Sequence, residues 1–85
     1  MTLSSLPPEL QERIRRLCVR LWASDVLLET ARSRDDFIDA FDEASLVCRE
    51  VVDVLRHLPQ DFTDEDVRRM FDVCLTEAKL KNTDN

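Results

Sequence analysis

Apolar residues recur at alternating steps of four and three along most of this chain, which is the pattern of amphipathic helices. Three such series are separated by short polar joints. They predict helices over residues 7–32, 34–58 and 64–81, followed by a frayed polar tail at 82–85. We therefore expect one all-α domain, an antiparallel three-helix bundle of two long helices and one shorter helix that is completed by dimerisation.

The first predicted helix opens with Pro7 and Pro8, which suit a first turn because the missing N–H of proline needs no partner there. Its apolar series misses one step, at Ser24. Two interpretations stay open at that position: one continuous helix, or a break at which Ser24 caps a short extra helix. The series consists of Leu10, Ile14, Leu17, Leu21, Leu28 and Ala31.

Capping signals begin the second and third helices. Ser33 and Thr63 are each followed three residues later by an aspartate, Asp36 and Asp66, as in a capping box. Pro59 ends the second helix. The expected core positions are Phe37, Phe41, Ala44, Cys48, Val51, Leu55 and Leu58 in the second helix, and Val67, Phe71, Cys74 and Ala78 in the third.

The unequal helix lengths identify the first candidate surface. The short joint at 32–34 predicts a hairpin of two helices, each on the order of 35 Å long, beside which a third helix of about 25 Å returns. The third helix then ends before the hairpin tip. We expect a second copy of the chain or a foreign protein to cover the tip, unless the first helix bends over it. This tip surface consists of Leu27, Leu28, Ala31, Phe37, Ile38 and Phe41.

A second apolar group, at Val19, Trp22 and Val26, lies on the opposite face of the first helix. Tryptophan on an outer helix face is a common anchor of binding hot spots. The alternative is a rotated helix that buries Trp22 against the third helix. Both interpretations are kept as expectations.

Acidic residues concentrate near the hairpin tip, and the net charge of the chain is −6. Such acids fit a protein partner with a basic surface, or imitate nucleic acid toward a nucleic-acid-binding protein. They equally suit a solvated face that keeps a small protein soluble. The acids expected to face a partner are Asp35, Asp36, Asp39, Asp42 and Glu43.

A basic stripe of Arg13, Arg16 and Arg20 on the first helix supports a rival interpretation. In a symmetric dimer, two such stripes would follow the backbone of duplex RNA or DNA and read its shape. The negative net charge disfavours this nucleic-acid binding and also binding to anionic membranes, because both depend on neutralising phosphates.

Candidate chemistry is sparse. The widely spaced Cys18, Cys48 and Cys74 lack a C-x-x-C pair and are expected to be reduced structural thiols, with a metal or redox role as the alternative. His57 is expected to interact with the last carbonyls of its helix. A chain without glycine cannot easily build a loop that holds phosphate. We expect no enzyme activity and no cofactor.

No apolar run approaches the roughly 20 residues of a membrane span, and the N-terminus lacks the basic start and apolar stretch of a secretory signal. These features, together with the odd number of cysteines, predict a protein of the cytoplasm, or of a host cell's cytoplasm. The predicted function is a small acidic protein-binding module. It would be an adaptor or inhibitor of the size that phages and mobile elements often encode.

Overall fold

Three α-helices and one short 3₁₀-helix make up the computed structural model, which describes residues 1–83, with side chains as far as residue 81. In chain order they are η1 (Leu3–Ser5), α1 (Pro8–Thr30), α2 (Arg34–His57) and α3 (Asp64–Thr83). The described residues contain no strand, so the all-α prediction is confirmed. α3 extends through 82–83, which the sequence places in a polar tail, and 84–85 lie outside the described residues. None of the helices in this part of the chain has an apolar stretch long enough to cross a membrane.

Helices α2 and α3 begin at the caps that the sequence predicts. The backbone N–H of Asp36 donates to Ser33 Oγ over 3.1 Å at the start of α2. At the start of α3, two residues form reciprocal hydrogen bonds. The N–H of Asp66 donates to Thr63 Oγ1 over 3.1 Å, and the N–H of Thr63 donates to Asp66 Oδ2 over 3.2 Å. Caps of this kind are worth about 1 kcal/mol each.

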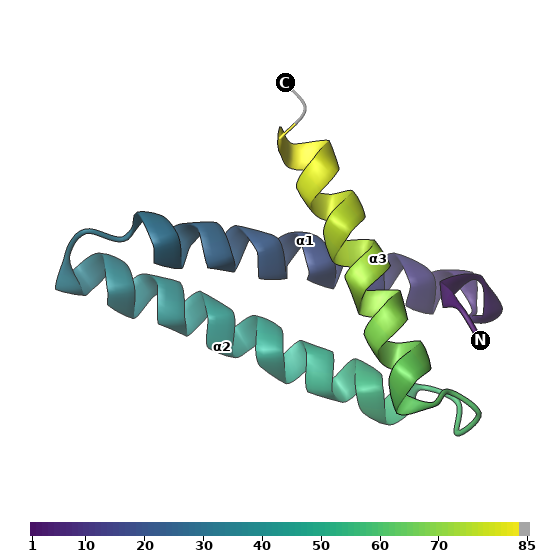
Figure 1. Ribbon diagram of the computed structural model, residues 1–85. Helices are drawn as coiled ribbons and strands as arrows, with labels where there is room; N and C mark the ends of the chain where they lie inside the picture. The colour runs from purple at the N-terminus through teal and green to yellow at the C-terminus, as the bar shows by residue number, and fades with distance from the viewer. Residues whose placement is uncertain (84–85) are drawn as a thin grey trace.

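α1 and α2 lie side by side as a hairpin, and α1 is the helix against which both other helices pack (Figure 1). Salt bridges join the hairpin helices, from Arg13 to Asp53 at 2.9 Å and from Arg20 to Glu50 at 2.7 Å. The sequence predicts that the third helix returns lengthwise along the first. Instead α3 begins near the end of α2, crosses α1 and then points away from both helices (Figure 1).

The face of α1 that enters the core is the one that the sequence predicts. Ile14 and Leu17 are fully buried. Ser24, the interruption in the apolar series, is buried as well, and its hydroxyl donates to the carbonyl oxygen of Arg20 over 2.9 Å. The backbone therefore satisfies this hydroxyl within the helix, and α1 continues through Ser24 without the predicted alternative break.

α2 is rotated about its axis relative to the sequence prediction. Four residues that the sequence predicts in the core are exposed instead: Phe37, Phe41, Cys48 and Leu55. Small and β-branched side chains let α1 and α2 approach closely, and this rotation also carries the carboxylates of α2 to the arginines of α1. We call the series that packs against α1 the inner seam: Ala40, Ala44, Val47, Val51, Val54 and Leu58.

The N-terminal segment, for which the sequence predicts no role, closes one end of the core. Leu6 follows η1 and is only 3% exposed. Gln11 Nε2 donates to the Leu6 carbonyl oxygen over 2.7 Å. The amino group of Met1 lies 3.6 Å from Asp66 Oδ2. These contacts tie the start of the chain to α1 and α3.

Candidate protein-binding surface

The tip surface lies where α3 leaves the hairpin uncovered. Phe37, Ile38 and Phe41 of α2 are 43%, 50% and 58% exposed, and Leu27 of α1 is 49% exposed. The two remaining members are half-buried. α1 does not bend over its own tip, so that alternative is not found. Burying a fully exposed large apolar side chain is worth about 1.5–3 kcal/mol, and these side chains, which are about half exposed, would contribute roughly half of that when a partner covers this surface.

Carboxylates border the tip surface on α2. Asp35, Asp39 and Asp42 are exposed and belong to none of the ion pairs among the described residues. Asp36, also exposed, sits in the first turn of α2, where a negative charge suits the helix dipole. Glu43 differs, because its Oε1 lies 3.4 Å from a guanidinium nitrogen of α1. Most of the acidic cluster is therefore available to meet basic side chains.

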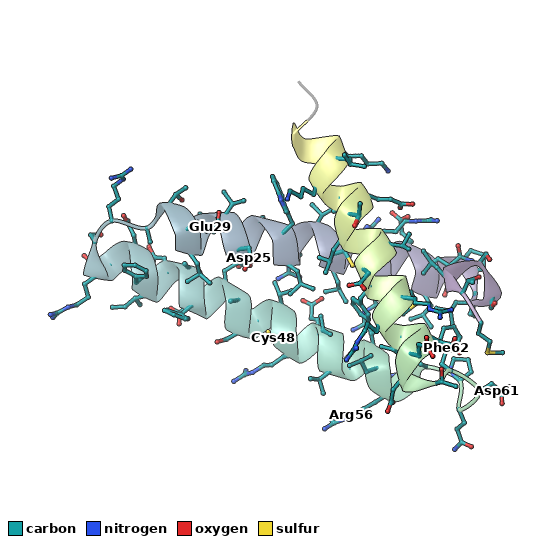
Figure 2. All side chains as sticks on the ribbon, viewed as in Figure 1. Asp25, Glu29, Cys48, Arg56, Asp61 and Phe62 are labelled. Carbon is teal, nitrogen blue, oxygen red and sulfur yellow. The ribbon has the colours of Figure 1, made fainter. Side chains whose placement is uncertain are left out.

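Trp22 is half-buried in a shallow groove between α1 and α3, while Val19 nearby is exposed. Trp22 thus lies beside Leu75 and Lys79 of α3, but it is only partly buried and α1 is not rotated, so neither expectation for this tryptophan is met in full. Asp25 and Glu29 give the groove an acidic border on α1 (Figure 2). The groove is lined by Leu21, Trp22, Asp25, Val26, Glu29, Leu75 and Lys79.

Ion pairs occupy the basic stripe of α1. Arg13 and Arg20 form the salt bridges to α2 described above, and Arg16 Nε lies 3.2 Å from Glu12 Oε1. The hydrogen bond to Glu50 raises the pKa of the Arg20 guanidinium. A carboxylate therefore accompanies each guanidinium, which weakens the attraction of the stripe for a nucleic-acid backbone.

The three cysteines lie in two different environments. Cys18 of α1 and Cys74 of α3 are buried, and the two thiols are close enough to influence each other's pKa. Burial raises the pKa of Cys18 to about 12 and raises the pKa of Cys74 as well. Cys48 is exposed on α2 (Figure 2). Within residues 1–81, no group of histidine, cysteine or acidic side chains is arranged to hold a metal ion.

His57 makes its contacts within its own helix. Its Nδ1 lies 2.7 Å from the carbonyl oxygen of Asp53 and 3.8 Å from Asp53 Oδ1. The hydrogen bond from Arg13 lowers the pKa of the Asp53 carboxyl, and the nearby His57 lowers it further. The imidazole therefore interacts with the end of α2, as the sequence predicts.

A second apolar series on α2 is exposed, although sequence reasoning placed part of it in the core. It advances in alternating steps of three and four, as a packing seam does. A helix with two adjacent seams is suited to two neighbouring helices, whereas the extensive packing of α2 in the described residues is against α1. The spacing of these residues, which interleaves with that of the inner seam along α2, was the signal in the sequence that could have revealed the second series. We call this series the outer seam: Ile38, Phe41, Ser45, Cys48, Val52 and Leu55.

Four charges at intervals of seven residues run beside the outer seam. Seven residues are two helical turns, so the charges form one row along α2. All four are exposed, and none belongs to an ion pair of the described residues. The row is acidic toward the hairpin tip and basic toward the other end, where Figure 2 labels Arg56. We call it the charged flank: Asp35, Asp42, Arg49 and Arg56.

Comparison with known proteins gives no relative, because the chain matches no protein-family model, no curated protein and no solved structure. The function is therefore inferred from the surfaces of the molecule itself.

Proposed function

We propose that this chain is a small acidic protein-binding module, an adaptor or inhibitor that occludes or bridges a protein partner and catalyses no reaction. One observation carries the proposal: the tip surface is exposed on a folded hairpin and is bordered by carboxylates without ion pairs. An apolar patch holds a partner by desolvation, while the charges around it steer the encounter. The complementary partner is a protein surface that combines apolar side chains with lysine or arginine.

The rival function, shape-reading of duplex RNA or DNA, has weaker support. Arg13, Arg16 and Arg20 would each have to leave a carboxylate before meeting a phosphate. A nucleic-acid-mimicking inhibitor is compatible with our proposal, because it too would bind a basic protein through the acids of α2.

Leu27 offers the sharpest test, because its side chain is exposed on α1 and does not belong to the hydrophobic core cluster of the described residues. We expect Leu27→Asp to keep the helical content of the wild type and to reduce capture of the partner from a cell lysate by more than about tenfold. Thr76→Asp, at an exposed position of α3, is the matched control and should capture the partner normally. Quantitative mass spectrometry of the captured proteins measures the difference. Identical capture by all three chains would refute the proposal.

The acidic border is tested separately. Glu29 and Asp39 are exposed and take part in none of the ion pairs among the described residues. A Glu29→Gln/Asp39→Asn variant should bind the captured partner more slowly, with a weaker dependence on salt, because exposed charges act mainly on the association rate. Binding of duplex RNA or DNA by the wild type, with affinity falling steeply as salt rises, would instead favour the rival function.

A further inference from the structure

We infer that the outer seam binds the outer seam of a second copy of this chain, with the two α2 helices antiparallel and related by a two-fold axis. The inference builds on the proposed function, because it divides the exposed tip surface between two occupants. A second copy of the chain covers Phe37, Ile38 and Phe41. Leu27 and the Trp22 groove then remain available to a different protein.

The apolar pattern of the outer seam is complementary to itself. Its steps of three and four are those of two helices that pack knobs into holes. When the helix is laid against a reversed copy, each seam residue meets another seam residue, and the two-fold axis repeats every layer. The layers are Ile38 with Leu55, Phe41 with Val52, and Ser45 with Cys48.

The charged flank determines the direction of the pairing. In the antiparallel arrangement, Asp35 faces Arg56 of the second copy and Asp42 faces Arg49 of the second copy. The axis repeats both pairs, so that all four charges of each chain gain an opposite partner. In a parallel arrangement the row would face the opposite border of the seam, which is apolar. The carboxylates and guanidinium groups would then stay unpaired.

The exposed area of the isolated chain is large enough for such an interface. Its accessible surface is 6402 Å², whereas a typical folded monomer of this mass exposes about 5200 Å². The excess of about 1200 Å² exceeds the roughly 800 Å² that each partner contributes to a standard interface. The radius of gyration is 14.0 Å, against about 12 Å for a compact domain of this length. The isolated chain is therefore less compact than a typical monomer of its size.

An apolar groove lies where the second copy would place an aromatic side chain. The antiparallel alignment brings Phe37 of the second copy level with Leu58, where α2 meets the start of α3. Phe62, labelled in Figure 2, lies in this corner. The groove is lined there by Leu55, Leu58, Phe62, Val67 and Phe71. Phe37, which is 43% exposed in the isolated chain, thereby gains an apolar site.

Charge reversal tests the pairing and its direction together. Asp42→Arg places two like-charged pairs in the dimer, and Arg49→Asp does the same with the opposite sign. We expect each single variant to raise the dissociation constant of the dimer on the order of tenfold or more, and the Asp42→Arg/Arg49→Asp double variant to recover most of the loss. Sedimentation equilibrium gives the constants, and circular dichroism checks that every variant is folded. Asp35→Arg/Arg56→Asp repeats the test at the outer pair.

Thiol cross-linking supplies a second measurement. Ser45→Cys places a thiol level with Cys48 of the second copy, so oxidation should join two chains through a disulfide, which needs Cβ atoms about 4 Å apart, far more efficiently than it joins wild-type chains. Adding Cys48→Ala should abolish the gain, and Thr76→Cys should not produce it. A monomeric wild type at high concentration, a double variant no tighter than the single variants, or cross-linking independent of Cys48 would each overturn the inference.

The proposed function and this inference fail in distinguishable ways. A chain that stays monomeric but captures a partner through Leu27 overturns the dimer alone. A chain that dimerises as predicted, while Leu27→Asp captures the same proteins as the wild type, supports the dimer and overturns the proposed function. Arg49→Asp and Leu27→Asp alter different surfaces, because Arg49 lies outside the tip surface and its acidic border, so each of these two variants addresses one proposal.

Discussion

Cys18 and Cys48 show how the surroundings of a single side chain decide its chemistry. Cys18 is enclosed between α1 and α3, where burial, the neighbouring Cys74 and the charge of Glu77 all disfavour a thiolate. Cys48 is exposed on the outer seam. Spacing in the sequence allowed all three thiols to meet in one site. The rotation of α2 prevents this, because it turns Cys48 away from α1.

Alkylation rates should therefore separate the cysteines. With a pKa of about 12, the Cys18 thiol is almost entirely protonated at neutral pH, and the thiolate is the reactive form. At protein concentrations low enough to keep the chain monomeric, we expect iodoacetamide to modify Cys48 rapidly in the native protein, and Cys18 and Cys74 only after unfolding. Peptide mass spectrometry over a time course, with and without urea, measures the three rates. Native modification of Cys18 as fast as that of Cys48 would contradict the packing of α1 against α3.

The two seams of α2 belong to the scale of the element. The sequence predicts the existence, type and approximate bounds of the helices, because periodicity, prolines and caps act locally. It does not predict the rotation of α2, since the inner and outer seams have the same spacing and both include apolar side chains. That choice depends on close approach to α1 and on the salt bridges to Arg13 and Arg20, which are tertiary contacts.

Truncation of the two seams should have unequal effects on stability. Val47 is fully buried in the inner seam, so Val47→Ala should lower the free energy of unfolding by about 1.5–3 kcal/mol. Leu55 is 39% exposed in the outer seam, and Leu55→Ala should cost less than about 1 kcal/mol in the monomer. Urea denaturation at low protein concentration compares them. A larger loss of stability for Leu55→Ala than for Val47→Ala would contradict the observed rotation of α2 and favour the core face that the sequence alone predicts.

The cap of α3 should respond to pH through only one of its two hydrogen bonds. The hydrogen bond from the backbone of Thr63 lowers the pKa of Asp66, so its carboxylate stabilises the fold above the ordinary aspartate pKa, and this contribution is lost as pH falls through the lowered value. The destabilisation by Asp66→Asn should therefore fade in acid. Thr63→Ala removes the other hydrogen bond and should lower the free energy of unfolding by about 1 kcal/mol at both neutral and acidic pH.

Denaturation curves at neutral and acidic pH measure both cap variants. Thr76→Ala is the control, because this exposed threonine bonds only to a carbonyl of its own helix, and its replacement should change stability by less than about 0.5 kcal/mol. A cost of Asp66→Asn that persists in acid would show that the carboxylate does not carry the pH dependence.

At the scale of the whole molecule, the two ends of the α1–α2 hairpin are covered unequally by the rest of the chain. The end of the hairpin where α2 stops is closed by α3 and by the N-terminal segment, while the tip is open (Figure 1). The sequence predicts an uncovered tip from the helix lengths alone. It does not predict the crossing of α3 over α1, because the angle between helices depends on which ridges interlock, and periodicity does not specify that.

The central position of α1 has a consequence for the order in which the molecule opens. α3 can detach and leave the α1–α2 hairpin in place, but α1 cannot open without releasing both neighbours. We expect the amide hydrogens of α1 to exchange with solvent most slowly, and those of α3 to exchange earlier through partial opening. Hydrogen exchange followed by mass spectrometry measures this order, and faster exchange in α1 than in α3 would contradict it.

The same arrangement separates the parts of the sequence that maintain the fold from the part that meets other molecules. Changes on the core face of α1 are transmitted to both neighbouring helices, so few substitutions are tolerated there. The outer seam contributes little to the folded monomer and can therefore change its side chains during evolution with little loss of stability. A scaffold of this kind can acquire a new binding specificity one surface residue at a time.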